Sequence, residues 1–255
     1  MIINFFRYID RKLLFNQLRN IYNFFLYIKS VLYIKSFQDY SKSFYNFTNE
    51  LDILCDKYGS DKGFNDLKSR TLYLNRNPHN YTSVYNSLFN HCRKDIKLVL
   101  ECGIGTNNPK IQSTMGERYK PGASLFVWRD YFQNAEIFGC DVDRNILFND
   151  SRIKTNYVDQ LDRNSIELMF SEINRDNFDL IIDDGLHTYK AATNFFDIAF
   201  KYLKPGGLYI IEDVGWNYIL SLVNYLKDYQ LEVIHFKTKR LKLLKDSNLV
   251  ILRKN

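Results

Sequence analysis

From residue 97 onward, short apolar runs typical of strands alternate with longer patterns typical of amphipathic helices. The expected strands cover 97–101, 135–141, 153–158, 179–183 and 208–212, and helices are expected over 81–93, 124–131, 191–203 and 219–229. Such an alternation predicts a parallel sheet with helices on its faces. Two last strands, 231–237 and 248–253, follow each other without a helix. Because directly joined strands pair antiparallel, one strand of this seven-stranded sheet is expected to be reversed.

The resulting architecture is an α/β fold with a Rossmann-like, mostly parallel sheet over residues 51–255. Residues 1–50 form a separate extension with apolar residues near helical spacing. These residues are Phe5, Leu13, Leu14, Leu18, Ile21, Phe25 and Ile28. We predict a helix that packs on the main domain or contacts a second copy. A membrane-surface helix is the less favoured interpretation.

Charge and cysteine content exclude several classes of protein. The net charge is +6, and residues 1–50 hold seven Lys/Arg against three Asp/Glu. The remainder has no dense basic stripe, which argues against nucleic-acid binding. No apolar stretch near the N-terminus reaches a membrane-spanning length free of charge, and no secretory signal is evident. The cysteines, Cys55, Cys92, Cys102 and Cys140, lack CxxC spacing, so we expect reduced thiols in a cytoplasmic protein.

The first expected strand ends in the sequence Glu101-Cys102-Gly103-Ile104-Gly105. Glycines at this point let the backbone turn sharply and approach a ligand in the crevice at the carboxyl ends of the strands. The motif lacks the third glycine of the dinucleotide fingerprint. Asp141 ends the second strand, where a carboxylate can accept hydrogen bonds from ribose hydroxyls. The same role would serve NAD, so Asp141 alone does not choose the cofactor.

Polar residues also follow the third strand. Asp159 and Gln160 would suit an adenine amino group, and capping of the following helix is an equally favoured alternative.

Acidic residues end the fourth and fifth strands, namely Asp183, Asp184, Glu212 and Asp213. Parallel strands open onto one crevice, so these side chains are expected to converge. Carboxylates this close raise each other's pKa unless a cation compensates them. We therefore predict a Mg²⁺ site with Asp184, Glu212 and Asp213 as ligands. Helix capping is the alternative for some of them.

His187 lies three residues after Asp184. Histidine titrates near neutral pH and can accept a proton from a hydroxyl group. We predict that His187 acts as a general base, in preference to a structural role.

Together these residues resemble the macrocin O-methyltransferase-like group of metal-dependent sugar methyltransferases. The matching pieces are Tyr58-Gly59-Ser60-Asp61-Lys62, His79, Tyr81, Tyr85, the Glu101–Gly105 motif, Gly122-Ala123-Ser124-Leu125, Trp128-Arg129-Asp130-Tyr131-Phe132, Asp159-Gln160, Asp183-Asp184-Gly185-x-His187 and Glu212-Asp213. They span about residues 52–215. Leu186 departs from the pattern, since a small polar residue is more usual there, and residues 1–50 have no counterpart.

The resemblance implies a class I fold that binds S-adenosylmethionine and Mg²⁺ and methylates a hydroxyl of a sugar or glycan-linked acceptor. The residues expected to bind the cofactor are Glu101, Gly103, Gly105, Ser124, Asp141, Asp159, Gln160 and Asp183. By the same resemblance, His187 is the base and Asp184, Glu212 and Asp213 hold the metal.

Other functions stay open at this point. A phosphate-derived group on a glycan precursor would also suit bound Mg²⁺. A nucleotide-binding oxidoreductase would use the same fold, and a non-catalytic module could associate with a membrane through its N-terminus. The sequence does not fix the oligomeric state, and a homo-oligomer is allowed.

Overall fold

The computed structural model describes residues 17–18, 21–22, 24–39, 48–63, 79–235 and 248–255. Phe5, Leu13 and Leu14 of the N-terminal pattern, and residues 236–237 of an expected strand, lie outside the described residues.

The described strands form one mixed sheet in the order β1-β8-β9-β7-β6-β2-β3-β5-β4. Their bounds are β1 Phe37–Asp39, β2 Leu98–Cys102, β3 Glu136–Asp141, β4 Asn149–Asp150, β5 Ile153–Tyr157, β6 Phe178–Asp183, β7 Leu203–Ile211, β8 Gln230–His235 and β9 Asn248–Arg253. Strand β9 runs antiparallel to both β7 and β8. The consecutive pairs in the run β7-β6-β2-β3-β5 are all parallel. The predicted Rossmann-like sheet, with β9 as its reversed strand, is thus confirmed, and the edge strand β4 is also antiparallel, to β5.

Two short edge strands and two helices were not predicted, and one of these helices is α2, Glu50–Tyr58. Strand β1 belongs to the segment expected to be helical, and it pairs in parallel with β8. Strand β4 has only two residues and both are exposed, so it carries no alternating pattern to detect. Helix α5, Arg163–Ile173, follows β5 and is capped by Asp162. The division of the chain at residue 50 stays a prediction.

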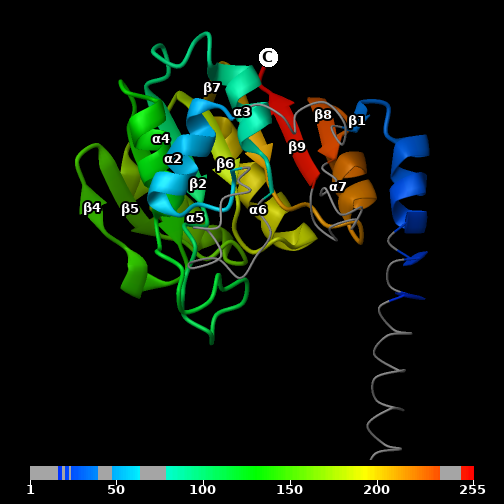
Figure 1. The fold of residues 1–255 in the computed structure, drawn as a ribbon, viewed down its shortest axis with the longest axis horizontal. Coiled ribbons are helices and arrows are strands. Elements are labelled where there is room, and N and C mark those ends of the chain that lie inside the picture. The colour runs from blue at the N-terminus through cyan, green and yellow to red at the C-terminus, as the bar shows by residue number, and fades with distance from the viewer. Residues whose placement is uncertain (1–16, 19–20, 23, 40–47, 64–78, 236–247) are drawn as a thin grey trace, which may run out of the picture.

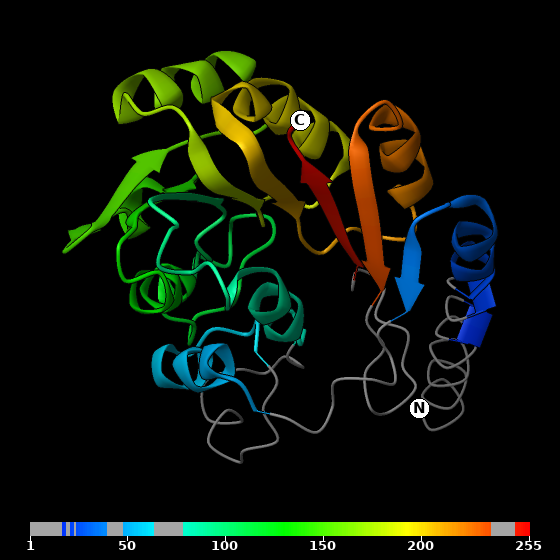
Figure 2. The same ribbon diagram turned by 90° about the horizontal axis from the view of Figure 1, so that it is seen from above.

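Helices cover both faces of the sheet (Figure 1). On one face lie α2 (Glu50–Tyr58), α3 (Thr82–Phe89) and α4 (Ala123–Tyr131), and on the other lie α5, α6 (Tyr189–Ala199) and α7 (Ile219–Tyr225), as Figure 2 shows. Two 3₁₀ turns, Arg144–Ile146 and Phe200–Tyr202, are also present, and residues 24–33 form a helix that precedes β1. The core has two clusters, one under each helical layer, because strands covered on both faces must bury side chains in both directions.

The parallel strands place the polar residues of the sequence at one edge. Strand β6 is buried along its whole length up to Asp183, and β3 is buried from Ile137 to Asp141. The chain turns sharply at each carboxyl end, and Asp162 and Thr188 then start α5 and α6 as N-caps. Side chains just after the strands therefore point into a shared crevice rather than into the core.

Candidate active site

A cavity of about 460 Å³ opens at the carboxyl ends of the parallel strands. This is a usual size for a small-molecule site. Most predicted site residues line it: Gly103, Gly105, Ser124, Asp141, Asp159, Gln160, Asp184, His187 and Asp213. Glu101, Asp183 and Glu212 do not line the cavity but are buried beneath it, with exposed fractions of 3% or less. The crevice predicted from the strand ends is therefore present, and three of the predicted residues support its floor.

The two glycines after β2 are required by close packing. Gly103 has φ +88°, and a Cβ atom there would lie 2.0 Å from the carbonyl oxygen of Asp184. Gly105 has φ +81°, and its Cβ would meet the ring of Tyr119 at 2.3 Å. A side chain at either position would be both strained and obstructed. The loop consequently presents bare backbone to the cavity.

Asp141 fastens this loop to the end of β3. Its Oδ2 accepts a hydrogen bond from the Ile104 amide and its Oδ1 accepts one from the Asp143 amide, both at 2.9 Å. Burial raises the pKa of Asp141, and these backbone donors oppose that rise. The carboxylate still faces the cavity, and its oxygens retain lone pairs for a ligand hydroxyl. The ribose role of Asp141 stays a prediction that this placement supports.

Neither Asp159 nor Gln160 is the N-cap of α5, because Asp162 takes that position. Asp159 accepts from the Leu161 amide at 2.8 Å. Gln160 donates to Asp183 at 2.7 Å and accepts from the Leu186 amide at 2.8 Å. Gln160 therefore ties the loop after β5 to the loop after β6, and of the two side chains Asp159 is freer to contact a ligand.

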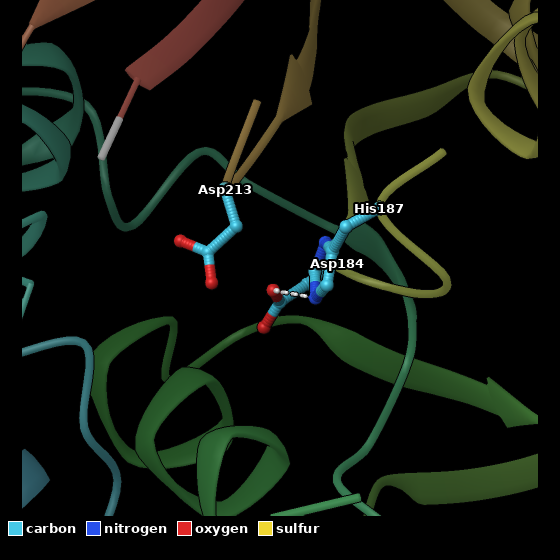
Figure 3. A group of neighbouring side chains, drawn as sticks. All are labelled: Asp184, His187 and Asp213. Atoms are coloured by element: carbon cyan, nitrogen blue, oxygen red, sulfur yellow. Dashed lines mark ion pairs between the residues drawn. The ribbon is translucent and has the colours of Figure 1, made fainter. Parts of the chain in front are cut away.

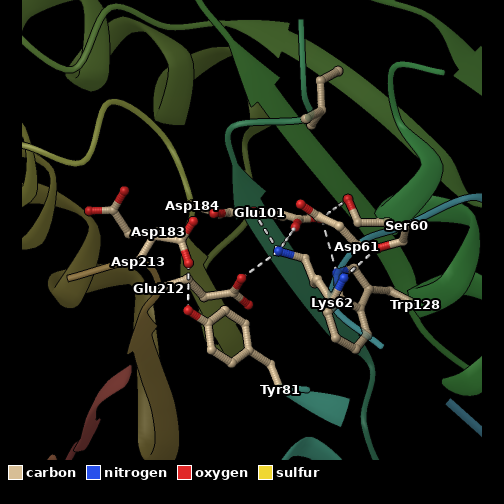
Figure 4. Close-up of polar contacts among 12 residues, drawn as sticks. Ser60, Asp61, Lys62, Tyr81, Glu101, Trp128, Asp183, Asp184, Glu212 and Asp213 are labelled. Carbon is tan, nitrogen blue, oxygen red and sulfur yellow. Dashed lines mark hydrogen bonds and ion pairs between the residues drawn. The ribbon is translucent and has the colours of Figure 1, made fainter. Parts of the chain in front are cut away.

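An ammonium group occupies the centre of the acidic residues. The Nζ atom of Lys62 lies 3.1 Å from Glu101 Oε1, 2.5 Å from Asp184 Oδ2 and 2.6 Å from Glu212 Oε2 (Figure 4). We call these four residues the lysine centre. Burial alone would lower the pKa of Lys62, but the three carboxylates raise it well above its usual value. The sequence prediction that the ends of β6 and β7 bring their carboxylates together is confirmed, although part of the compensating charge belongs to the protein.

Further hydrogen bonds fix the two glutamates of the lysine centre. Glu101 Oε2 accepts from Ser124 Oγ at 2.7 Å and from Trp128 Nε1 at 3.0 Å. Glu212 Oε1 accepts from the Tyr85 hydroxyl at 2.5 Å. Burial raises the pKa of both Glu101 and Glu212, with Lys62 opposing the rise. By formal charge one ammonium does not balance three ionised carboxylates, and the raised pKa values of Glu101 and Glu212 partly relieve this excess by favouring their protonated forms.

A second group faces the cavity beside the lysine centre. Oxygen or nitrogen atoms of Asp184, His187 and Asp213 all lie within 4.8 Å of one another, and we call these residues the rim triad (Figure 3). The Nε2 atom of His187 is 3.9 Å from Asp184 Oδ1. His187 and Asp213 have φ values of +55° and +51°, a strained backbone for residues other than glycine. Strain of this kind often marks a functional site.

The rim triad has the oxygen-rich chemistry that suits a hard divalent cation. Asp213 also accepts from the Tyr81 hydroxyl at 2.5 Å and lies 3.4 Å from His79 Nδ1. The negative charge left over from the lysine centre adjoins this site through Asp184, which belongs to both groups. The residues thus fit a bound cation. Lys62 and Tyr85 contact the two oxygens of Glu212, and its role as a metal ligand stays a prediction.

The sequence analysis gave no role to Lys62 or to the segment between β2 and α4, although both shape the site. Lys62 appeared only within the family resemblance, and its partners lie 39 to 150 residues further along the chain. The other group forms a wall of the cavity from the segment between β2 and α4. Its members are Thr106, Ile111, Gln112, Ser113, Met115 and Tyr119. The unusual length of that segment was its only signal.

Comparisons with known proteins agree with this geometry. A family model described as a methyltransferase domain matches residues 120–214. The MycE methyltransferase of the mycinamycin biosynthetic pathway, solved with Mg, SAH and mycinamycin VI, shares the fold with a TM-score of 0.58 and 22% identity, over 82% of this chain and 55% of that one. The chain thus has the fold of the Rossmann-like class I methyltransferases and contains a methyltransferase domain.

Within that class, the similarity is to sugar O-methyltransferases. Demethylmacrocin O-methyltransferase of Streptomyces fradiae is 31% identical over 55% of this chain and 33% of its own length. L-olivosyl-oleandolide 3-O-methyltransferase of Streptomyces antibioticus is 30% identical over 68% of this chain and 39% of its own length. The predicted resemblance to the macrocin group is confirmed. The chain spans about one third of the length of these curated relatives.

Proposed function

We propose that this chain is a Mg²⁺-dependent O-methyltransferase that transfers a methyl group from S-adenosylmethionine to a hydroxyl of a sugar or glycan-linked acceptor. The observation that carries the proposal is that the rim triad and the glycine loop of β2 face the same cavity. The sugar O-methyltransferases among the relatives support the acceptor class. The product would enter a surface polysaccharide or a glycosylated metabolite. The absence of a disulfide among the four cysteines, all of them described, supports a reducing compartment, the cytoplasm.

In this proposal, the loop of Gly103 and Gly105 admits the cofactor and Asp141 holds its ribose. Asp159 faces the adenine. Asp184 and Asp213 would hold Mg²⁺, and the ion would make a nearby acceptor hydroxyl easier to deprotonate. His187, beside Asp184, accepts the hydroxyl proton at an imidazole nitrogen. S-adenosylmethionine supplies an activated methyl group, and the cavity walls align the acceptor oxygen with it.

The direct test is a cofactor-turnover assay on nucleotide sugars and glycan fragments. We expect release of S-adenosylhomocysteine with a subset of these acceptors in Mg²⁺ buffer, loss of the signal with EDTA, and recovery when Mg²⁺ is restored. Full turnover in metal-free buffer would remove the metal from the proposal.

Calorimetric titration separates this function from that of an oxidoreductase. S-adenosylhomocysteine should bind and NADH should not. The reverse preference would contradict the methyltransferase assignment altogether.

A further inference from the structure

An apolar surface lies at the edge of the fold beyond β1, on the helix that contains residues 24–33 (Figures 1 and 2). Many of the exposed large hydrophobic side chains in the described part of the chain gather here: Leu18, Ile21, Tyr22, Phe24, Phe25, Ile28, Val31, Leu32 and Tyr33. Leu32 and Phe25 are 74% and 64% exposed. We call these nine residues the outward face. A patch of this density on an otherwise well-packed domain indicates a binding surface.

The opposite side of the helix is fixed to the protein. The Tyr27 ring contacts Trp216 edge-on with a centroid distance of 5.4 Å, and Phe37 of β1 lies 6.2 Å from the same ring. Ile34 is 6% exposed and belongs to the core cluster under α5, α6 and α7. Since this side anchors the helix, rotation cannot bury the outward face in the same domain.

The positive charge of this segment indicates which kind of partner binds the outward face. Residues 11–38 contain five basic residues and no acidic residue: Lys29 and Lys35 are described and exposed, whereas Arg11, Lys12 and Arg19 lie outside the described residues. A second copy of the helix would bring like charges together along with the apolar side chains. An anionic lipid surface instead complements both properties, because cationic side chains pair with headgroups while aromatic and aliphatic side chains enter the acyl boundary.

We propose that the outward face binds the surface of an anionic membrane and holds the methyltransferase domain there. The contact lies in the plane of the interface, and no helix among the described residues is long and apolar enough to cross a bilayer. This inference stands independently of the acceptor chemistry.

Flotation of the full chain with lipid vesicles tests the proposal. Vesicles of phosphatidylcholine alone are compared with vesicles that also contain phosphatidylglycerol. We expect binding only to the anionic vesicles, with a decrease at high salt. The variant F25S/L32S should lower the partition coefficient more than about tenfold. The variant K29Q/K35Q should lower it about fivefold per lysine.

Leu168→Ser is the matched control, since Leu168 of α5 is 64% exposed but lies outside this surface. It should bind vesicles as the unmodified chain does. Binding of S-adenosylhomocysteine by every variant checks that each is folded. Equal binding to neutral and anionic vesicles, or unchanged partition of F25S/L32S, would overturn the proposal. A concentration-dependent dimer that F25S/L32S abolishes, together with absent vesicle binding, would assign the surface to a second copy instead.

Discussion

Two charged clusters include residues from the same short segment of chain, but their positive and negative charges are in opposite proportions. Lys62 reaches the lysine centre, where a single buried cation meets three carboxylates, of which Glu101 and Glu212 are buried and Asp184 is 22% exposed. Tyr58, four residues earlier, donates to Asp130 of α4 at 2.5 Å, and Lys57 and Arg129 contact the same carboxylate at 3.0 Å. In this second group, which we call the α4 cluster, two cations and a hydroxyl surround one carboxylate that is 25% exposed.

This difference in charge balance indicates that the lysine centre serves function and that the α4 cluster serves stability. The α4 cluster is saturated and has no demand for a further ion. The lysine centre has a formal excess of negative charge next to a cavity. This excess is unfavourable in free energy unless a cation or a developing positive charge in the cavity compensates it. The comparison therefore predicts that changes near the lysine centre affect chemistry and cation binding, whereas changes in the α4 cluster affect stability alone.

The largest effect is expected for His187→Ala. Loss of a general base typically lowers turnover by about 10²- to 10⁴-fold. Affinity for S-adenosylhomocysteine should stay within about twofold, because the glycine loop and Asp141 are untouched. Methyl-transfer kinetics and calorimetry measure the two quantities. Tyr58→Phe in the α4 cluster is the control, with turnover expected to be unchanged. Equal losses of turnover and affinity in His187→Ala would argue against a proton-transfer role.

Lys62→Met should destabilise the fold strongly. Removing the cation leaves the buried Glu101 and Glu212 without their partner, and breaking a buried pair in this way costs about 3–5 kcal/mol. Thermal unfolding in metal-free buffer should show the loss. Added Mg²⁺ or Mn²⁺ should then raise the melting temperature of Lys62→Met more than that of the unmodified chain. An equal shift in both would mean that the excess charge of the centre does not draw the cation.

The sequence predicted the core strands and the meeting of acidic strand ends because both follow from local patterns. Apolar runs locate β2, β3, β5, β6 and β7, and parallel topology alone brings Asp184 near Asp213. The roles of Glu101 and Asp183 were less accessible. Glu101 is next to last in β2 and Asp183 is last in β6. Whether such a carboxylate faces the cavity or its floor depends on Ser124, Trp128 and Gln160, which approach from other elements.

Lys62 shows the limit most clearly. Four carboxylates near one crevice correctly implied a counter-charge, and the argument from sequence assigned it wholly to a metal ion. Lysine is rarely buried, and nothing local marks Lys62 as a residue that is 3% exposed. Only the folded arrangement, in which the segment after α2 reaches the ends of β6 and β7, shows that the chain supplies part of the charge itself.

A moderate loss is expected for Asp130→Asn. The substitution removes a carboxylate that two cations and the Tyr58 hydroxyl stabilise. Since Asp130 is partly exposed, solvent screening reduces the value of these contacts, and we expect a loss of about 1–2 kcal/mol in unfolding free energy at neutral pH. Turnover by the folded variant should be unchanged. A change in Mn²⁺ affinity would contradict the separation of the two clusters.

The smallest and most specific effect concerns the pH dependence of that loss. Burial alone would raise the pKa of Asp130, but the Tyr58 hydroxyl, Lys57 and Arg129 lower it from 3.8 to about 2. A carboxyl group with a lowered pKa in the folded state contributes stability above its unfolded pKa and loses that contribution as pH falls toward the folded value. The stability difference between the unmodified chain and Asp130→Asn should therefore be constant above about pH 5 and shrink between about pH 4 and pH 2. Denaturant titrations across this range measure it. A difference that stays constant down to pH 2 would show that Asp130 acts through packing, and the α4 cluster would then no longer be the charge-saturated counterpart of the lysine centre.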